Sequence, residues 1–134
     1  MDKATLLKMP ESNYMDKEQT DFFKSLLVSL ALEKTEALNS ARKQLGALGN
    51  PSDVSDQGTI EETRSMISRT IDRANRALVD IRTALSAIQD DAYGYCIVSG
   101  ERIGLERLLA NPTAMLCAEA QTIQEGTRKH YTAA

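Results

Sequence analysis

The most regular feature of the sequence is a seven-residue repeat of apolar positions between residues 60 and 88. One row keeps this spacing throughout: Ile60, Ile67, Ala74, Ile81 and Ile88. A second row lies four residues behind the first: Arg64, Ile71, Leu78 and Leu85. Alternating steps of four and three are typical of a coiled-coil seam. The pattern predicts a helix of about 40 Å at 1.5 Å per residue, with Thr59 and Glu62 as its candidate cap.

A less regular helical stripe precedes this repeat. Asp16 and Gln19 have the spacing of an N-terminal capping box. Lys34 interrupts an apolar row that otherwise consists of Phe23, Leu27, Leu30, Ala37, Ala41, Leu45 and Leu48. Glycine and proline at residues 46–51 end the stripe. Two helices of similar length joined by a short turn predict an antiparallel hairpin.

The remainder of the chain is short and irregular. After residue 91 the heptad period is lost, and a glycine-punctuated apolar stretch predicts a small globule with a final helix from about Pro112 to His130. We therefore predict a mainly α-helical chain in three parts. Residues 1–15 pack on the globule, residues 16–90 form a coiled-coil hairpin with its tip at 49–58, and residues 91–134 form the globule and C-terminal helix. A two-helix seam cannot make a compact globule, so we expect the long antiparallel hairpin to project from the small domain.

Composition and charge exclude several classes of function. The 134 residues carry a net charge of −3 without a run of Lys or Arg, so phosphate-based or sequence-specific binding of DNA is not expected. The apolar windows are too short to span a membrane and the first residues do not resemble a signal peptide, so we expect a cytoplasmic monomer. Neither a nucleophile motif nor a phosphate-binding loop occurs, and the single histidine, His130, is near the C-terminus. We expect no enzymatic activity and no cofactor.

The two cysteines have the outline of a metal site with half of its ligands missing. Cys96 with Ser99, and Cys117 with Ala120, occupy the positions of two C-x-x-C pairs, the spacing of a four-thiolate zinc site. Ser99 and Ala120 do not supply the remaining ligands, so we predict no bound metal. Two interpretations stay open: two buried small hydrophobic residues, or a degenerate zinc ribbon. The ribbon would be held by apolar packing of Ile97, Val98, Ile103, Leu105, Leu108 and Leu116.

The turn GNPSDVSDQG, residues 49–58, contains two carboxylates, Asp53 and Asp56, and no basic residue. Its residue types favour turns, and Asp56 is placed to cap the second helix. Capping requires only one aspartate, however. Two carboxylates at the end of a long arm could instead contact a metal ion, a basic pocket or the catalytic centre of a partner.

Residues 93–122, YGYCIVSGERIGLERLLANPTAMLCAEAQT, resemble the C-terminal signature of the DksA/TraR family. The signature is aromatic-Gly-x-C-x-x-C-G-x-x-I-G-x-x-R-L-x-A-x-P-T-x-x-x-C-x-x-C. This chain matches it at Gly94, Cys96, Gly100, Ile103, Gly104, Arg107, Leu108, Ala110, Pro112, Thr113 and Cys117. The N-terminal PESNYMDKEQTDFF is also similar to the family. With Ser99 and Ala120 in place of cysteines, the chain resembles its cysteine-poor, zinc-independent members.

This resemblance implies a regulator that binds core RNA polymerase and acts on sensitive promoters, such as those for ribosomal RNA, in the stringent response. In the family a D-x-x-D-x-A tip enters the secondary channel and acts near the catalytic magnesium; its register falls on Asp53, Asp56 and Gly58. Arg73 corresponds to a family arginine expected at the channel rim. The alarmone ppGpp is an implied partner at the interface. Its family positions fall on Ala77, Asp80, Asn111 and Gln121, where the expected basic character is largely missing.

Two alternatives to this function stay open. The first is a channel-binding factor that stimulates transcript cleavage by lending its tip carboxylates to a second magnesium ion. The second is a generic coiled-coil adaptor that makes no contact with RNA polymerase.

Overall fold

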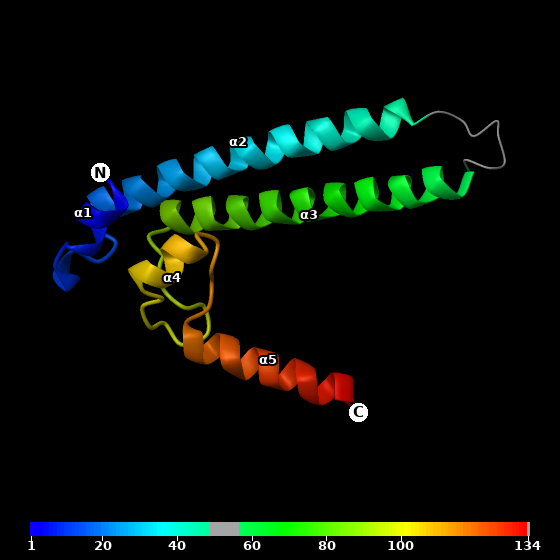
Figure 1. Cartoon of the computed structure of the whole chain (residues 1–134). Helices are drawn as coiled ribbons and strands as arrows, with labels where there is room; N and C mark the ends of the chain where they lie inside the picture. The colour runs from blue at the N-terminus through cyan, green and yellow to red at the C-terminus, as the bar shows by residue number, and fades with distance from the viewer. Residues whose placement is uncertain (49–56, 134) are drawn as a thin grey trace. The chain divides into compact units, whose positions relative to one another are not determined.

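The computed structural model of the chain describes residues 1–48 and 57–133, and their side chains apart from those of residues 57 and 128–133 (Figure 1). The elements, in chain order, are α1 (Lys3–Leu7), the 3₁₀ turn η1 (Glu11–Asn13), α2 (Lys17–Ala47), α3 (Gln57–Gln89), α4 (Leu105–Ala110) and α5 (Ala118–Ala133). Within the described ranges, extended pairing is limited to one antiparallel bridge between Tyr95 and Arg102. The predicted mainly α-helical fold is confirmed.

The chain divides into two compact units, and both long helices contribute to each of them. The first unit comprises Met1–Leu27 and Thr83–Ala134, and the second comprises Val28–Arg82. The functional division into residues 1–15, 16–90 and 91–134 stays a prediction.

In the second unit, α2 and α3 run antiparallel, side by side (Figure 1). The side chains buried in this unit are Leu38, Ala41, Ile67, Ala74 and Ile81. Three of these five belong to the first row of the predicted heptad repeat, at spacings of seven residues. The first row therefore forms the seam, as the sequence indicates.

The other half of the seam agrees with the prediction only in part. On α3, Ile71, Leu78 and Leu85 of the predicted second row are half-buried, whereas Arg64 is exposed. Thr63, Thr70 and Ala77, one residue before each position of that row, are half-buried as well, and Ala84 is fully buried. On α2, Ala37 is exposed and Leu38 is buried in its place. Lys34 is half-buried, so it is part of the seam and does not interrupt it.

The N-terminus of α2 has the predicted capping interaction. Asp16 Oδ1 accepts a hydrogen bond of 2.9 Å from the Gln19 amide, and Gln19 Oε1 accepts one of 3.0 Å from the Met15 amide. The first bond satisfies a backbone N–H group that the first turn of a helix leaves free, and the second ties the residue before the cap to the helix. The cap predicted for α3 is wrong, because the helix begins at Gln57 and Thr59 already lies inside it.

The first unit has a small apolar core around the beginning of α2. Phe23 and Leu27 are fully buried, and the Phe23 ring lies 5.5 Å from that of Tyr93. Leu6 of α1 and Leu108 of α4 are also fully buried. This core contains few large side chains, so the surrounding polar contacts contribute much to the conformation of the unit.

Tyr14 joins the N-terminal segment to the C-terminal part of this unit. Its hydroxyl donates a 2.6 Å hydrogen bond to the Gly94 carbonyl and accepts a 2.9 Å bond from the Gly104 amide. The Arg102 guanidinium lies 4.9 Å from the centre of the Tyr14 ring and donates to the Glu11 carbonyl at 3.1 Å. Gly94 has a φ of 90°, and an added Cβ there would lie 2.7 Å from Met15 Cγ, so only glycine fits.

The last helix begins later than predicted. Pro112 and Thr113 resemble a helix start, yet α5 begins at Ala118. The Met115 carbonyl accepts a 3.0 Å hydrogen bond from the Ile97 amide, and Arg107 Nε donates a 3.0 Å bond to the Leu116 carbonyl. These contacts with distant residues hold the segment outside a helix.

The seam can be tested with two leucines of α2. Leu38 is 6% exposed and Leu32 is 62% exposed. We expect Leu38→Ala to lower the free energy of unfolding by about 2–3 kcal/mol, because a buried side chain is removed. The same exchange at Leu32 should change it by less than about 0.5 kcal/mol.

Denaturant unfolding followed by circular dichroism measures both values. Because the two variants make the same exchange on the same helix, differences in helix propensity cancel. Equal losses of stability would show that Leu38 is not part of the seam.

A second prediction concerns alkaline pH. The Tyr93 hydroxyl donates a 2.7 Å bond to the Pro112 carbonyl, and burial raises the pKa of Tyr93 above its ordinary value. Burial also raises the pKa of Tyr14. The protonated tyrosines therefore contribute stability in full below about pH 10, and this contribution is lost as the pH rises further.

We expect the free energy of unfolding to fall above that pH, and less steeply in Tyr93→Phe. Parallel titrations of phenolate absorbance and circular dichroism measure both effects. If every tyrosine ionised at its ordinary pKa while the protein stayed folded, the described burial would be contradicted.

Candidate functional site

Of the predicted tip residues, the structure describes only Gly58. Asp53 and Asp56 lie outside the described residues. Gly58 is the second residue of α3, and a Cβ added to it would meet no atom within 4 Å. Packing among the described residues therefore does not require glycine here, and the alanine of the family pattern would fit.

Arg73 lies on an exposed part of α3 in the second unit. Its Nη2 donates a 3.3 Å hydrogen bond to Thr70 Oγ1, which orients the guanidinium along the helix. Arg73 borders a shallow hollow of about 450 Å³ between α2 and α3, lined by Ala41, Gln44, Thr63, Met66, Ile67, Arg69, Thr70 and Arg73. Met66, whose side chain is 61% exposed, contributes apolar surface to this hollow beside two arginines.

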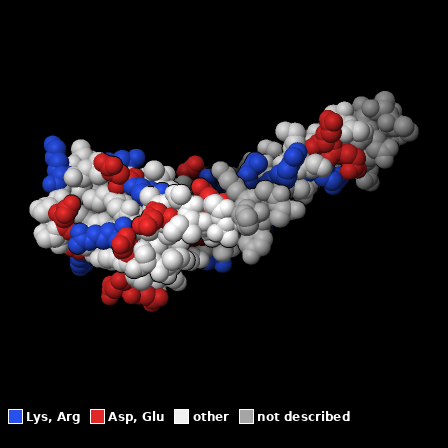
Figure 2. Space-filling view, turned by 90° about the horizontal axis from the view of Figure 1, so that it is seen from below, with Lys and Arg blue, Asp and Glu red and all other residues white. Residues whose placement is uncertain are grey.

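The sequence prediction named Arg73, whose role stays a prediction, and did not name Met66 and Arg69, which line the same hollow. Met66, Arg69 and Arg73 follow one another at steps of three and four, which places them on one face of the helix. This spacing can be recognised in the sequence and indicates a shared helix face. On the side shown in Figure 2, basic and acidic side chains are interspersed along the described surface. Such a mixed surface suits a protein partner better than a nucleic-acid backbone.

The four positions of the predicted degenerate ribbon come together in the first unit. Cys96 and Cys117 are buried free thiols, Ala120 is buried and Ser99 is exposed. Ser99 Oγ lies 3.7 Å from Cys117 Sγ, which also accepts a 3.4 Å hydrogen bond from the Ala120 amide. Backbone bonds close the loop: the Cys96 amide donates to the Glu101 carbonyl at 2.7 Å, and the Gly100 amide donates to the Cys96 carbonyl at 2.9 Å.

The surroundings of Cys96 favour its thiolate. Hydrogen bonds from the Ser99 side chain, and from the amides of Cys117, Ser99 and Val98, lower the pKa of Cys96 to about 6, although burial opposes this shift. Amides directed at a sulfur are a geometry suited to a metal-bound thiolate. In this protein the same amides favour the free thiolate of Cys96.

These positions do not fit the four-coordinate zinc that their spacing suggests. Zinc needs four nitrogen, sulfur or carboxylate ligands, and the Ala120 methyl group is none of these. The Ser99 hydroxyl is a poor substitute for a thiolate. Across the described part of the chain, no group of three or more His, Cys, Asp or Glu side chains could hold a metal ion.

Two residues of the expected apolar ribbon core are in fact exposed. Ile97 and Val98 are 68% and 74% exposed, whereas Ile103 and Leu108 are buried. The turn between Cys96 and Gly100, where Gly100 has a φ of 75°, directs the two intervening apolar side chains outward. Val98 borders a hollow of about 410 Å³ whose lining also includes Leu116, Ile123, Glu101 and Glu119.

The four positions predicted to face ppGpp hold one alanine, two side chains with local hydrogen bonds and one carboxylate. Asn111 Oδ1 accepts a 3.0 Å bond from Thr113 Oγ1, and Gln121 Nε2 donates a 3.0 Å bond to Glu125 Oε1. Asp80 is exposed and Ala77 is half-buried. None of these four residues presents a cation to a phosphate.

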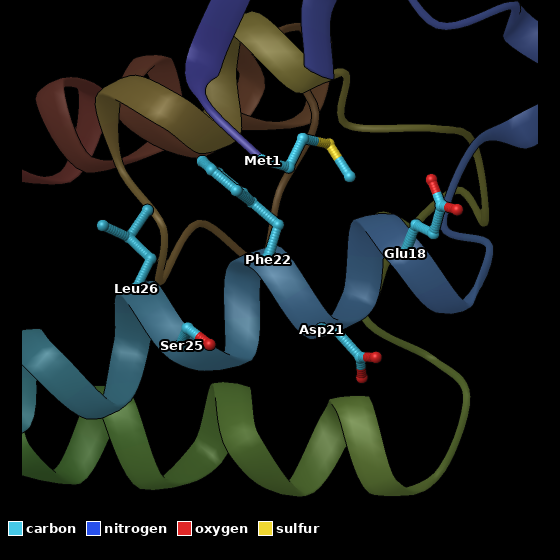
Figure 3. A pocket seen from close by; sticks show the side chains of 6 residues that line it. All are labelled: Met1, Glu18, Asp21, Phe22, Ser25 and Leu26. Carbon is cyan, nitrogen blue, oxygen red and sulfur yellow. The ribbon is translucent and has the colours of Figure 1, made fainter. Parts of the chain in front are cut away.

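A further hollow, of about 560 Å³, lies beside the first turns of α2 (Figure 3). Met1 and Phe22 point into its apolar part, whereas Asp21 points away from Met1 (Figure 3). Its lining combines the apolar side chains of Met1, Phe22 and Leu26 with Ser25 and the carboxylates of Glu18 and Asp21. Among the described helices, none is long and apolar enough to cross a membrane.

Comparison with known sequences connects these features to one group of proteins. Residues 92–126 match the family model of the prokaryotic dksA/traR C4-type zinc finger. The chain is 33% identical over 129 residues to the RNA polymerase-binding transcription factor DksA of Caulobacter vibrioides, covering 93% of this chain and 89% of that protein. It is 30% identical over 117 residues to the protein of the same name from Escherichia coli K12, covering 87% and 78%.

Comparison with solved structures gives the same result for the fold. The structure of transcription factor DksA2 from Pseudomonas aeruginosa matches with a TM-score of 0.87 at 38% sequence identity. The match covers 96% of this chain and all of that one. The similarity therefore includes the hairpin as well as the cysteine-containing region.

Proposed function

The chain belongs to the DksA/TraR family, and on this premise we propose that it is a transcription regulator that binds core RNA polymerase. The observation that carries the proposal is similarity over nearly the whole chain to proteins named RNA polymerase-binding transcription factors. The hairpin enters the secondary channel of the polymerase and lowers initiation at sensitive promoters, such as those for ribosomal RNA. This function places the protein in the bacterial cytoplasm.

The geometry of the second unit supports entry into a channel. Two packed helices, each about 10 Å across, make an element about 20 Å wide. Because the seam is apolar and continuous, the pair resists bending better than a single helix would. A narrow, stiff element of this kind can place a few side chains deep inside a large enzyme.

The proposed active end is the pair Asp53 and Asp56, with Gly58 behind it. In a confined channel of low dielectric, two carboxylates act strongly on nearby positive groups and on the network around the catalytic magnesium. The proposed effect is destabilisation of the open promoter complex, which requires no metal binding by the tip itself.

Arg73 is the proposed contact with the channel rim. It combines a fixed orientation, through Thr70, with an apolar neighbour, Met66, and a second cation, Arg69. Arginine beside an exposed apolar side chain is a common composition at the centre of protein interfaces.

The regulator acts in the stringent response, with ppGpp as a further partner at the interface. Ala77, Asp80, Asn111 and Gln121 supply no cation to the nucleotide, so any synergy with ppGpp should depend mainly on groups of the polymerase. The proposed regulator is also independent of zinc, because hydrogen bonds among Cys96, Ser99, Cys117 and Ala120 take the place of a metal.

The tip is tested with Asp53→Asn and Asp56→Asn, which remove charge without changing shape. We expect the double variant to lose on the order of tenfold or more of its inhibition of a ribosomal RNA promoter, the equivalent of about 1.4 kcal/mol. Its affinity for core RNA polymerase should be nearly unchanged. Asp72→Asn, at an exposed carboxylate of α3, is the matched control and should inhibit normally.

The same experiment separates binding to RNA polymerase from inhibition of the promoter. Arg73→Ala should weaken binding on the order of tenfold, about 1.4 kcal/mol. Arg82→Ala, exposed on the opposite face of α3, should not. Full inhibition by the tip double variant would contradict the proposed role of the carboxylates. Stimulated transcript cleavage that requires Asp53 would instead show a cleavage factor, and no binding to core polymerase would favour a coiled-coil adaptor.

Zinc independence gives a further prediction. Structural zinc supplies about 10–16 kcal/mol in small zinc-finger domains, so its removal unfolds them. We expect a strong zinc chelator to leave the thermal unfolding midpoint of this protein unchanged and zinc analysis to find far less than one ion per chain. A large fall of the midpoint on chelation would show that a metal stabilises the fold. A zinc-containing family member treated in parallel is the positive control.

A further inference from the structure

The cysteine pair retains the environment of a metal site after losing half of its ligands. Both cysteine side chains are buried, and Cys117 Sγ accepts a 3.4 Å hydrogen bond from the Ala120 amide. Ser99 Oγ, three residues after Cys96, lies 3.7 Å from Cys117 Sγ. The loop that holds Cys96 and Ser99 is closed by its own backbone bonds, and the Ile97 amide joins it to the Met115 carbonyl just before Cys117. The two cysteine positions are therefore brought together by this loop.

Two sulfurs are too few for zinc, but they suit an ion that prefers two soft ligands. Thiolates select Cu(I), whose full d shell imposes no tetrahedral requirement. Cys96 and Cys117 are only 3% and 7% exposed, which limits the competition from water as a ligand.

We propose that Cys96 and Cys117 bind one Cu(I) ion as a two-coordinate dithiolate site. Each thiol releases its proton to solvent, so one positive ion replaces two protons and the bound group carries one negative charge. The amide donors around both sulfurs offset that charge. No electron is transferred, because copper enters and stays as Cu(I).

Ser99 has a positioning role at this site. Its hydroxyl lies within hydrogen-bond distance of Cys117 Sγ and is too weak a ligand to be needed as a third. Ser99→Ala should therefore retain the ion, with an affinity changed by no more than about a hundredfold, as is usual for residues that support a ligand.

The test uses the reduced full-length protein without oxygen, titrated with Cu(I) in competition with a chromogenic Cu(I) chelator. We expect one ion per chain for the wild type and for Ser99→Ala, and loss of competition in Cys96→Ser and in Cys117→Ser. X-ray absorption at the copper edge of the wild type should show two sulfur ligands. Circular dichroism verifies that each variant is folded.

The complementary control restores cysteine at the two positions that lack it. Ser99→Cys combined with Ala120→Cys should bind Co(II), a zinc surrogate, with a tetrahedral absorption spectrum, and the wild type should not. Full Cu(I) competition by Cys96→Ser or Cys117→Ser, nitrogen or oxygen ligands in the absorption spectrum, or failure of the wild type to compete would each overturn the proposal. None of these readouts depends on RNA polymerase, so they are independent of the proposed function.

Discussion

A helix of 31 or 33 residues that carries only a narrow apolar stripe needs a second helix to bury that stripe. Most of the surface of α2 and α3 is polar, and among the described residues of the second unit the buried side chains are Leu38, Ala41, Ile67, Ala74 and Ile81. Each helix is therefore stable largely because of the other. Every role proposed for the tip and for Arg73 depends on a pair that keeps its register.

In the first unit, polar contacts supplement an apolar core that has few large side chains. The Tyr14 hydroxyl joins the N-terminal segment to Gly94 and Gly104, and the Tyr93 hydroxyl holds the segment that precedes α5. The two sulfurs keep the amide donors that would surround a metal, while Ser99 occupies part of the space between them. The loop around a degenerate zinc site can thus keep its conformation through hydrogen bonds alone. The same arrangement leaves two thiols for the proposed binding of Cu(I), which is a softer ion than zinc.

The sequence predicted the helical hairpin well, because period and capping are local properties. Its errors came from interactions that local patterns do not contain. In the sequence, Lys34 is a polar interruption of the apolar stripe, yet its aliphatic stem allows it to be half-buried. The buried residue that follows it on α2 is Leu38 and not the predicted Ala37. Pro112 indicates a helix start, but contacts with Ile97 and Arg107 delay α5 to Ala118. Ile97 and Val98 are apolar but exposed, because the turn after Cys96 directs them outward. Asp53 and Asp56 could be identified from register, and their role remains a prediction.

The central claim is that residues 49–58 reach the catalytic region of RNA polymerase. It is tested most directly by replacing Ser55, between the two aspartates, with the photo-crosslinking amino acid p-benzoylphenylalanine. Illumination of the complex with core polymerase, followed by mass spectrometry, then locates the tip. The account predicts adducts on polymerase segments that surround the catalytic magnesium, and loss of those adducts when unlabelled protein competes. Adducts restricted to the outer surface of the polymerase, or none at all from a variant that still binds, would contradict it.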